Sequence, residues 1–232
     1  MDFKNFDQRH YAFVSPREGY GEWADDYEQC VPDLLDLKVL NHLESVDWAY
    51  AEPALDLACG TGRTGQWLQS RGVATLDGLD ITPEMLEQAK TKAIYRHLKL
   101  GTVEHTELSP EQYALITMCL ADEHLASLQG VYQEAFRLAK PGAMFVVVGM
   151  HPFFFMFGMP THFDGKDGQP KAIHTHVHLF SDHFRAAQAA GWRLQESYEG
   201  LIDDDWIQVK PKWKKHQDCP VNYGYVWVKD HQ

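Results

Sequence analysis

The sequence contains little that would suit a disulfide-stabilised or membrane-spanning protein. Its four cysteines are scattered and form neither a C-x-x-C pair nor a zinc-finger spacing. We therefore expect reduced thiols and a cytoplasmic protein. The first ten residues lack the apolar core of a signal peptide. The longest apolar stretch, residues 143–158, is too short and too interrupted to span a bilayer.

Positive charge is also scarce. The chain has 21 Lys and Arg residues against 33 Asp and Glu residues, which gives a formal net charge of −12. Such an average field repels DNA and RNA, although a local basic patch could still exist. The charge therefore favours a small molecule or a basic partner, and we expect a small-molecule acceptor and no nucleic acid.

The apolar pattern alternates between strand-like and helix-like segments. It predicts strands over residues 53–58, 73–79, 99–104, 113–120, 143–150, 192–200 and 222–229. It predicts helices over residues 22–44, 62–70, 123–139 and 181–190, and a further helix capped by Thr82. This order predicts an α/β fold with a doubly wound, seven-stranded sheet, mostly parallel, with an antiparallel C-terminal edge strand. We expect one domain over residues 1–232, with an N-terminal helical cap (1–48) and a lid-like excursion (151–179).

The strongest local motif is LDLACGTGRTG at residues 55–65, which runs from a buried strand through glycines into a helix. Glycines let the backbone approach a ligand closely, and a helix N-terminus favours negative charge. Asp80 ends the next predicted strand, where a carboxylate can accept hydrogen bonds from both ribose hydroxyls of an adenosine-type ligand.

The glycines at 60, 62 and 65 also spell the dinucleotide fingerprint G-x-G-x-x-G, so an NAD site is an alternative. Asp56 opposes it, because a carboxylate there suits a ligand with ammonium and sulfonium cations better than a pyrophosphate. About fifty residues precede the loop, and no second domain follows to hold a substrate against a nicotinamide. The Y-x-x-x-K pair of Tyr95 and Lys99 lies before the third strand, and we interpret it as a chance match.

Together these motifs resemble the class I S-adenosylmethionine (SAM)-dependent methyltransferases of the small-molecule branch, the type 11 family related to ubiquinone biosynthesis. LDLACGTGRTG is similar to the first motif of that family, and GLDITPEML (78–86) to the second. Residues 103–125 resemble the third and fourth motifs, and LAKPGAMFVVVG (138–149) the fifth strand. The sequence lacks the N/D-P-P-Y/F motif of amino-methylating DNA enzymes.

The resemblance implies a Rossmann-like methyltransferase fold, SAM as cofactor and S-adenosylhomocysteine as product. It implies that Asp80 holds the ribose and that Leu120 lies beside the methionine part of the cofactor. It also implies that Tyr20, Trp23 and Tyr27 close over the cofactor, although these aromatics could instead only anchor their helix. The other cofactor-binding residues that it implies are Asp56, Ala58, Cys59, Gly60, Thr61, Gly62, Ile81, Met85, Glu104, His105 and Cys119.

Methyl transfer needs positioning and at most one base, because the sulfonium is already activated. His151 follows a central strand at its carboxyl end and is our candidate general base, with a hydrogen-bonding lid histidine as the alternative. His174, His176 and His178 alternate as in a strand, but tetrahedral ligands usually come from separate elements, so we predict no metal. We predict methyl transfer to a small organic acceptor, to O before N or C. A non-catalytic SAM-binding module and an NAD(P)-dependent oxidoreductase are the alternatives.

Overall fold

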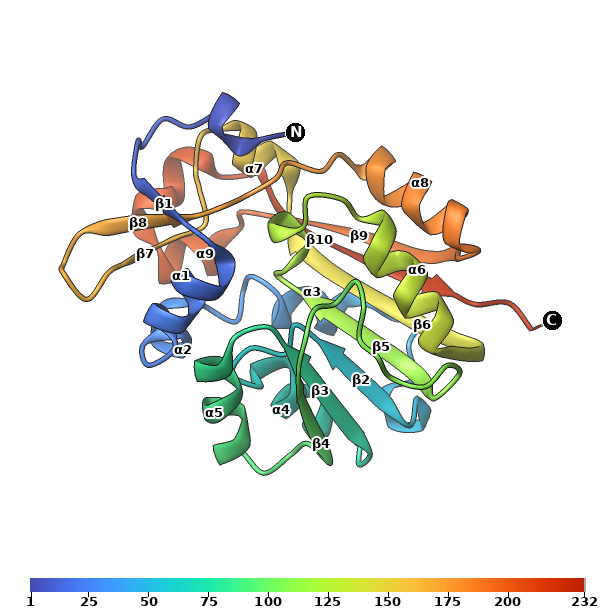
Figure 1. The fold of residues 1–232 in the computed structure, drawn as a ribbon. Coiled ribbons are helices and arrows are strands. Elements are labelled where there is room, and N and C mark those ends of the chain that lie inside the picture. Colours follow the sequence, from blue (N-terminus) through green and yellow to red (C-terminus); the bar gives the residue numbers. More distant parts are fainter. Residues whose placement is uncertain (232) are drawn as a thin grey trace.

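The computed structural model describes residues 1–231 and is built around a seven-stranded sheet (Figure 1). Its strand order is β4-β3-β2-β5-β6-β10-β9, with neighbours parallel from β4 to β6. The strands are β2 (Ala54–Leu57), β3 (Leu76–Asp80), β4 (His97–Leu100), β5 (Tyr113–Cys119), β6 (Ala139–Met150), β9 (Arg193–Leu201) and β10 (Pro220–Val228). The predicted doubly wound α/β fold is confirmed.

The antiparallel C-terminal strand is present, but it lies one place in from the sheet edge. β10 pairs antiparallel with both β6 and β9, so β9 forms the edge. Residues 221–227 of β10 are all buried, which suits a strand covered on both faces, whereas the exposure of β9 mostly alternates along the chain.

Helices cover both faces of the sheet. α6 (Gln129–Leu138) and α8 (Phe180–Ala190) pack side by side on one face, where Tyr132, Phe145 and Trp227 share a core (Figure 1). α3 (Leu37–His42) and α4 (Arg63–Ser70) bury Leu40, Trp67 and Leu68 on the opposite face. α5 (Pro83–Thr91) follows β3, and short 3₁₀ turns lie at Phe3–Asn5, Trp48–Tyr50 and Asp122–His124.

The helix predicted over residues 22–44 is wrong in extent, because the chain forms three short helices instead. These are α1 (Pro16–Trp23), α2 (Tyr27–Cys30) and α3. Asp36 accepts a hydrogen bond from the Leu37 N–H and so starts α3 afresh, after Pro32 has ended the preceding turn. The predicted helix over 123–139 likewise begins only at Gln129.

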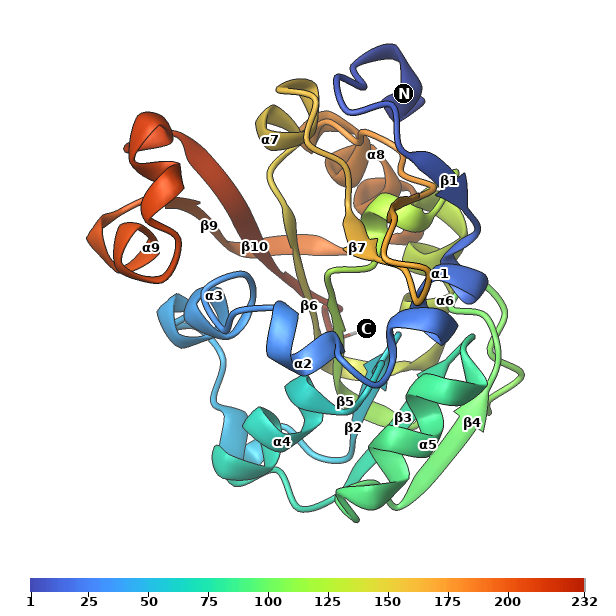
Figure 2. The same ribbon diagram turned by 90° about the vertical axis from the view of Figure 1, so that its left-hand side faces the viewer.

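The excursion after β6 is more regular than expected. It contains α7 (Pro152–Met156), β7 (His162–Asp164) and β8 (Pro170–Ile173), and the N-terminal strand β1 (Ala12–Val14) joins them in a second sheet of order β1-β8-β7. We call this sheet the roof, and it lies near α1 and the ends of β5 and β6 (Figure 2). α9 (Asp204–Val209) and a 3₁₀ turn at Pro211–His216 connect β9 to β10. No helix within residues 1–231 is long and apolar enough to cross a membrane.

Candidate functional site

The glycine loop makes a tight turn between β2 and α4. The Gly62 N–H donates to the Cys59 carbonyl at 2.8 Å, and the Cys59 N–H donates to the Leu79 carbonyl at 3.0 Å. Gly60 and Gly62 have φ values of +54° and +84°, which side chains rarely adopt. A Cβ on Gly60 would meet nothing within 4 Å, so open space remains beside this backbone.

Asp80 joins the end of β3 to this loop. One carboxylate oxygen accepts from the Gly60 N–H and the other from the Thr82 N–H, both at 2.8 Å. The residue is only 7% exposed, and burial raises the pKa of its carboxyl group. Because each carboxylate oxygen has further acceptor capacity, both can receive one more hydrogen bond from a ligand.

A cavity of about 260 Å³, here called the loop cavity, opens above the glycine loop. It brings together many of the residues that the sequence analysis singled out: Tyr20, Ala58, Gly60, Asp80, Ile81, Met85, Glu104 and Cys119. These residues come from α1, from α5 and from the ends of β2, β3, β4 and β5. A ligand in this cavity would therefore lie across the carboxyl edge of the sheet.

Other residues expected to touch the cofactor do not line this cavity: Asp56, Cys59, Thr61, Gly62, His105 and Trp23. Thr61 donates its hydroxyl to Glu28 at 2.5 Å, and His105 is exposed. Trp23 stacks on Phe163 at 5.5 Å between ring centroids and lines a neighbouring cavity instead.

Asp56 is buried, does not line the loop cavity, and is hydrogen-bonded to two hydroxyl groups. Its two oxygens accept from the Tyr95 hydroxyl at 2.8 Å and the Thr117 hydroxyl at 2.9 Å. Burial raises its pKa to about 7, against the opposing effect of these hydrogen bonds. Tyr95 therefore has a structural partner of its own, and the Y-x-x-x-K spacing does not explain its position.

The sequence analysis missed several residues of the loop cavity. They include Thr82 at the start of α5, and Ala121, His124 and Leu125 after β5. The available signal was the segment LADEHL at the carboxyl end of a central strand, where the rule for open α/β sheets places ligands.

His124 fixes Tyr20 between two cavities. The His124 Nδ1 lies 2.8 Å from the His174 carbonyl, which can only accept, so Nδ1 carries the proton. Nε2 therefore accepts from the Tyr20 hydroxyl at 2.9 Å. Burial lowers the pKa of His124 to about 4, so this tautomer is neutral near pH 7.

A second cavity, of about 280 Å³ and here called the aromatic cavity, adjoins the first. Both cavities are lined by Tyr20, Tyr27 and Leu120. The apolar and aromatic lining of the second includes Trp23, Met150, Phe154, Phe155, Phe163 and Trp213. A molecule in the aromatic cavity would thus lie next to a ligand in the loop cavity.

Glu123 places a buried carboxyl group on the wall of the aromatic cavity. It is 2% exposed, and its Oε1 accepts from the Thr161 hydroxyl at 3.3 Å. Its Oε2 has no hydrogen-bond partner among residues 1–231. Burial, and then the nearby charge of Asp122, raise the pKa of Glu123 to about 8.

His151, the expected general base, lines neither cavity. It caps α7 by accepting from the Phe153 N–H at 3.1 Å, and its Nε2 lies 3.6 Å from a Glu199 oxygen. This geometry corresponds to the alternative of a hydrogen-bonding histidine at the start of the excursion. Within residues 1–231, no group of three or more His, Cys, Asp and Glu side chains could hold a metal ion.

The chain is similar in sequence and fold to known methyltransferases. Residues 55–147 match the methyltransferase domain family. Methyltransferase-like protein 27 from Homo sapiens is 38% identical over 98 residues, which cover 40% of this chain and 40% of that relative. A ubiquinone biosynthesis O-methyltransferase from Pseudomonas fluorescens (strain SBW25) is 24% identical over 212 residues, or 87% of this chain and 89% of the relative. An S-adenosylmethionine-dependent methyltransferase from Mesorhizobium loti has the same fold, with a TM-score of 0.66, 16% identity, and coverage of 83% of this chain and 96% of that one.

Proposed function

We propose that this chain is a class I SAM-dependent methyltransferase, and that it transfers the methyl group of SAM to a small organic acceptor, with oxygen as the preferred nucleophile. The observation that carries this proposal is the pair of adjoining cavities that share Tyr20, Tyr27 and Leu120. One cavity has a polar edge at Asp80 and the glycine loop, and the other is largely apolar. In-line displacement requires this side-by-side placement of donor and acceptor.

The residues of the loop cavity fit SAM. Asp80 retains acceptor capacity for the ribose hydroxyls, and the open backbone at Gly60 admits the methionine end. Ile81 is 42% exposed and can cover a face of the adenine beside Met85, and Glu104 also lines this cavity. When bound, SAM supplies an activated methyl group on a sulfonium centre.

Glu123, rather than His151, is the group we assign to proton acceptance from the acceptor hydroxyl. Its unpartnered Oε2 belongs to a residue that lines the aromatic cavity, and its raised pKa gives it useful basicity near neutral pH. Tyr20, held by His124, lines both cavities and would contact both ligands.

A non-catalytic SAM-binding module is disfavoured by the state of the aromatic cavity. Such a module would be expected to have its acceptor space filled by the phenylalanine run at residues 153–157. Phe154 and Phe155 instead line an open cavity of about 280 Å³, and Phe157 is 48% exposed.

Calorimetry with SAM, S-adenosylhomocysteine and NADH tests the cofactor site. We expect the first two to bind and NADH not to bind, and we expect Asp80→Asn to weaken binding roughly tenfold or more, as loss of charged hydrogen bonds predicts. Asp77→Asn is the matched control, because Asp77 lies on the same strand but pairs with Arg96 outside the loop cavity. Tight NADH binding without a response to SAM would overturn the proposal.

The transfer itself is tested by incubating the protein with SAM and panels of phenols, alcohols, amines and carbon acids. Mass spectrometry then detects an added methyl group and the S-adenosylhomocysteine formed. Methylation of hydroxyl compounds is expected. Binding of SAM without turnover on any panel would favour the non-catalytic alternative.

A further inference from the structure

The aromatic cavity contains one lysine that the proposed chemistry does not use. Lys210 lines this cavity together with Trp213 and Phe154. We propose that Lys210 binds a carboxylate of the acceptor, so that the acceptor is an organic acid with its nucleophile near Glu123. This inference rests on the proposed function, since it assigns the aromatic cavity to the acceptor.

The backbone holds Lys210 in place at the turn between α9 and the following 3₁₀ turn. Its N–H donates to the Trp206 carbonyl at 2.8 Å, and its carbonyl accepts from the Trp213 N–H at 2.8 Å. The ammonium lies 5.2 Å from the centroid of the Trp213 ring, which is itself stacked on Trp206. The side chain is therefore directed along an aromatic wall of the cavity.

Lys210 has no carboxylate partner, in contrast to other partly buried lysines of this acidic chain. Lys38 contacts Asp203 and Asp205 at 2.6 Å, and Lys171 contacts Glu22 at 2.9 Å. Lys210 forms no salt bridge with any described residue, although it is only partly exposed. Burial, and then the charge of Lys212, lower its pKa. A bound carboxylate would pair with the ammonium and so offset the free-energy cost of burying its charge.

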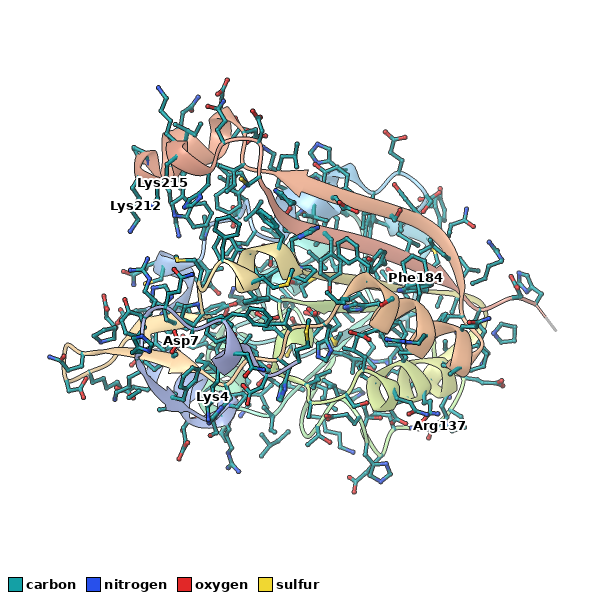
Figure 3. All side chains as sticks on the ribbon, turned by 90° about the horizontal axis from the view of Figure 1, so that it is seen from above. Lys4, Asp7, Arg137, Phe184, Lys212 and Lys215 are labelled. Carbon is teal, nitrogen blue, oxygen red and sulfur yellow. The ribbon has the colours of Figure 1, made fainter. Side chains whose placement is uncertain are left out.

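The aromatic cavity also contains the carboxyl groups of Glu123 and Asp164, but a basic cavity adjoins it. A neighbouring cavity of about 350 Å³ shares Phe154 and Met159 with the aromatic cavity, and its lining contains Arg9, Lys215 and His216. No acidic residue lines that neighbouring cavity within the described part of the chain. Lys212 and Lys215 lie on the segment that projects from the strands β9 and β10 (Figure 3). Four lysines thus follow one another closely over residues 210–215 of a chain whose net charge is −12.

A carboxylate suits this site better than a dianion, because one ammonium in a largely apolar cavity compensates one negative charge. The aromatic walls of the cavity favour an acid with an apolar or aromatic body. The acceptor we infer is thus an amphipathic hydroxy acid that presents its hydroxyl to Glu123 and its carboxylate to Lys210.

The test measures binding of matched carboxylate and amide pairs by calorimetry, with S-adenosylhomocysteine present. The probes are hydroxylated benzoic, cinnamic and medium-chain aliphatic acids, their neutral primary amides, and one aryl phosphate. We expect at least one acid to bind about tenfold more tightly than its amide. Lys210→Met should abolish this preference and Lys210→Arg should retain it.

Lys212→Met is the matched control, because it removes the same charge from a neighbouring lysine that lines neither cavity. It should change the acid-to-amide ratio less than about threefold, as expected for an exposed charge. Equal binding of every acid and its amide, or an unchanged ratio in Lys210→Met, would overturn the inference. Tighter Lys210-dependent binding of the aryl phosphate would overturn the choice of carboxylate.

The outcomes also separate this inference from the proposed function. If acids bind in a Lys210-dependent manner but no methyl transfer occurs, the carboxylate site at Lys210 is supported and the proposed methyltransferase activity is contradicted. If methyl transfer occurs only with neutral acceptors and is insensitive to Lys210→Met, the methyltransferase activity is supported and the carboxylate site is contradicted.

Discussion

At the scale of single residues, the site depends on carboxyl groups whose surroundings differ. Asp80 is held by two backbone N–H groups, Asp56 by two hydroxyls, and Glu123 by a single hydroxyl. Burial raises the pKa of all three, and the value for Glu123 is about 8. Only Glu123 combines this basicity with a place on the wall of the aromatic cavity.

Glu123→Gln should therefore lower kcat/KM by about a hundredfold or more, the range of general base catalysis. Since the base must be unprotonated, kcat/KM of the wild-type protein should rise with pH and level off above an apparent pKa near 8. The variant should lose this rise while keeping its affinity for S-adenosylhomocysteine. Asp164→Asn, an exposed carboxylate on the same cavity, is the control. An unchanged pH profile in Glu123→Gln would contradict the assigned role.

The raised pKa of Asp56 leads to a prediction about how the stability of the protein depends on pH. Its folded-state pKa of about 7 lies above its ordinary value of 3.8, so the folded protein holds this proton where the unfolded chain has lost it. The contribution of Asp56 to stability is thus present at low pH and is lost as pH rises toward 7. Relative to Asp56→Asn, the wild-type free energy of unfolding should fall between about pH 4 and pH 7 and then level off. Denaturant titrations across this range measure the difference.

Asp77→Asn is the control, because the contribution of Asp77 to the free energy of unfolding should depend on pH in the opposite direction. Burial raises the pKa of Asp77, but hydrogen bonds from Arg96 and Tyr113 outweigh it and lower the pKa overall. The stabilisation that Asp77 provides is therefore present at neutral pH and is lost in acid. If Asp56→Asn and wild type show parallel pH dependence, the raised pKa of Asp56 is contradicted.

At the scale of elements, the sequence predicted best where local pattern and burial agree. The run AMFVVVGM became the central strand β6, and the glycine loop joined β2 to α4 as expected. The predicted helix over 22–44 failed because an apolar stripe alone does not reveal where Asp36 restarts a helix. The position of β10 inside the sheet depends on which strands pair, and that information is not local.

The same distinction between local pattern and long-range packing applies to the residues of the candidate site. Asp80 and Gly60 could be predicted because they belong to one motif and its neighbouring strand. Glu123, His124 and Lys210 could not, because they acquire their roles from contacts with distant segments. His124, for example, reaches the carbonyl of residue 174, which lies in the roof region. Sequence patterns report such long-range packing poorly, whereas they report chain turns and strand ends well.

At the scale of the whole molecule, the N-terminal segment packs against the excursion after β6, next to the aromatic cavity. The N-terminal ammonium donates to the Val177 carbonyl at 2.7 Å, and Phe3 is completely buried. Phe3 packs edge-on against Phe155 at 6.3 Å between centroids, and Phe155 lines the aromatic cavity. The first residues of the chain therefore support the acceptor side of the site but do not line the loop cavity.

Phe3→Ala should therefore weaken acceptor binding while leaving cofactor binding unchanged. Removing this buried ring should destabilise the packing around Phe155 by roughly 3 kcal/mol, the cost of a large core truncation. Hydrogen exchange should then increase at residues 1–14 and 152–177, and acceptor KM should rise. Affinity for S-adenosylhomocysteine should stay within about twofold, because the loop cavity is built on the main sheet. Phe184→Ala, a 42% exposed ring on α8, is the control. An equal loss of both affinities would mean that the N-terminal segment stabilises the whole domain rather than the acceptor cavity.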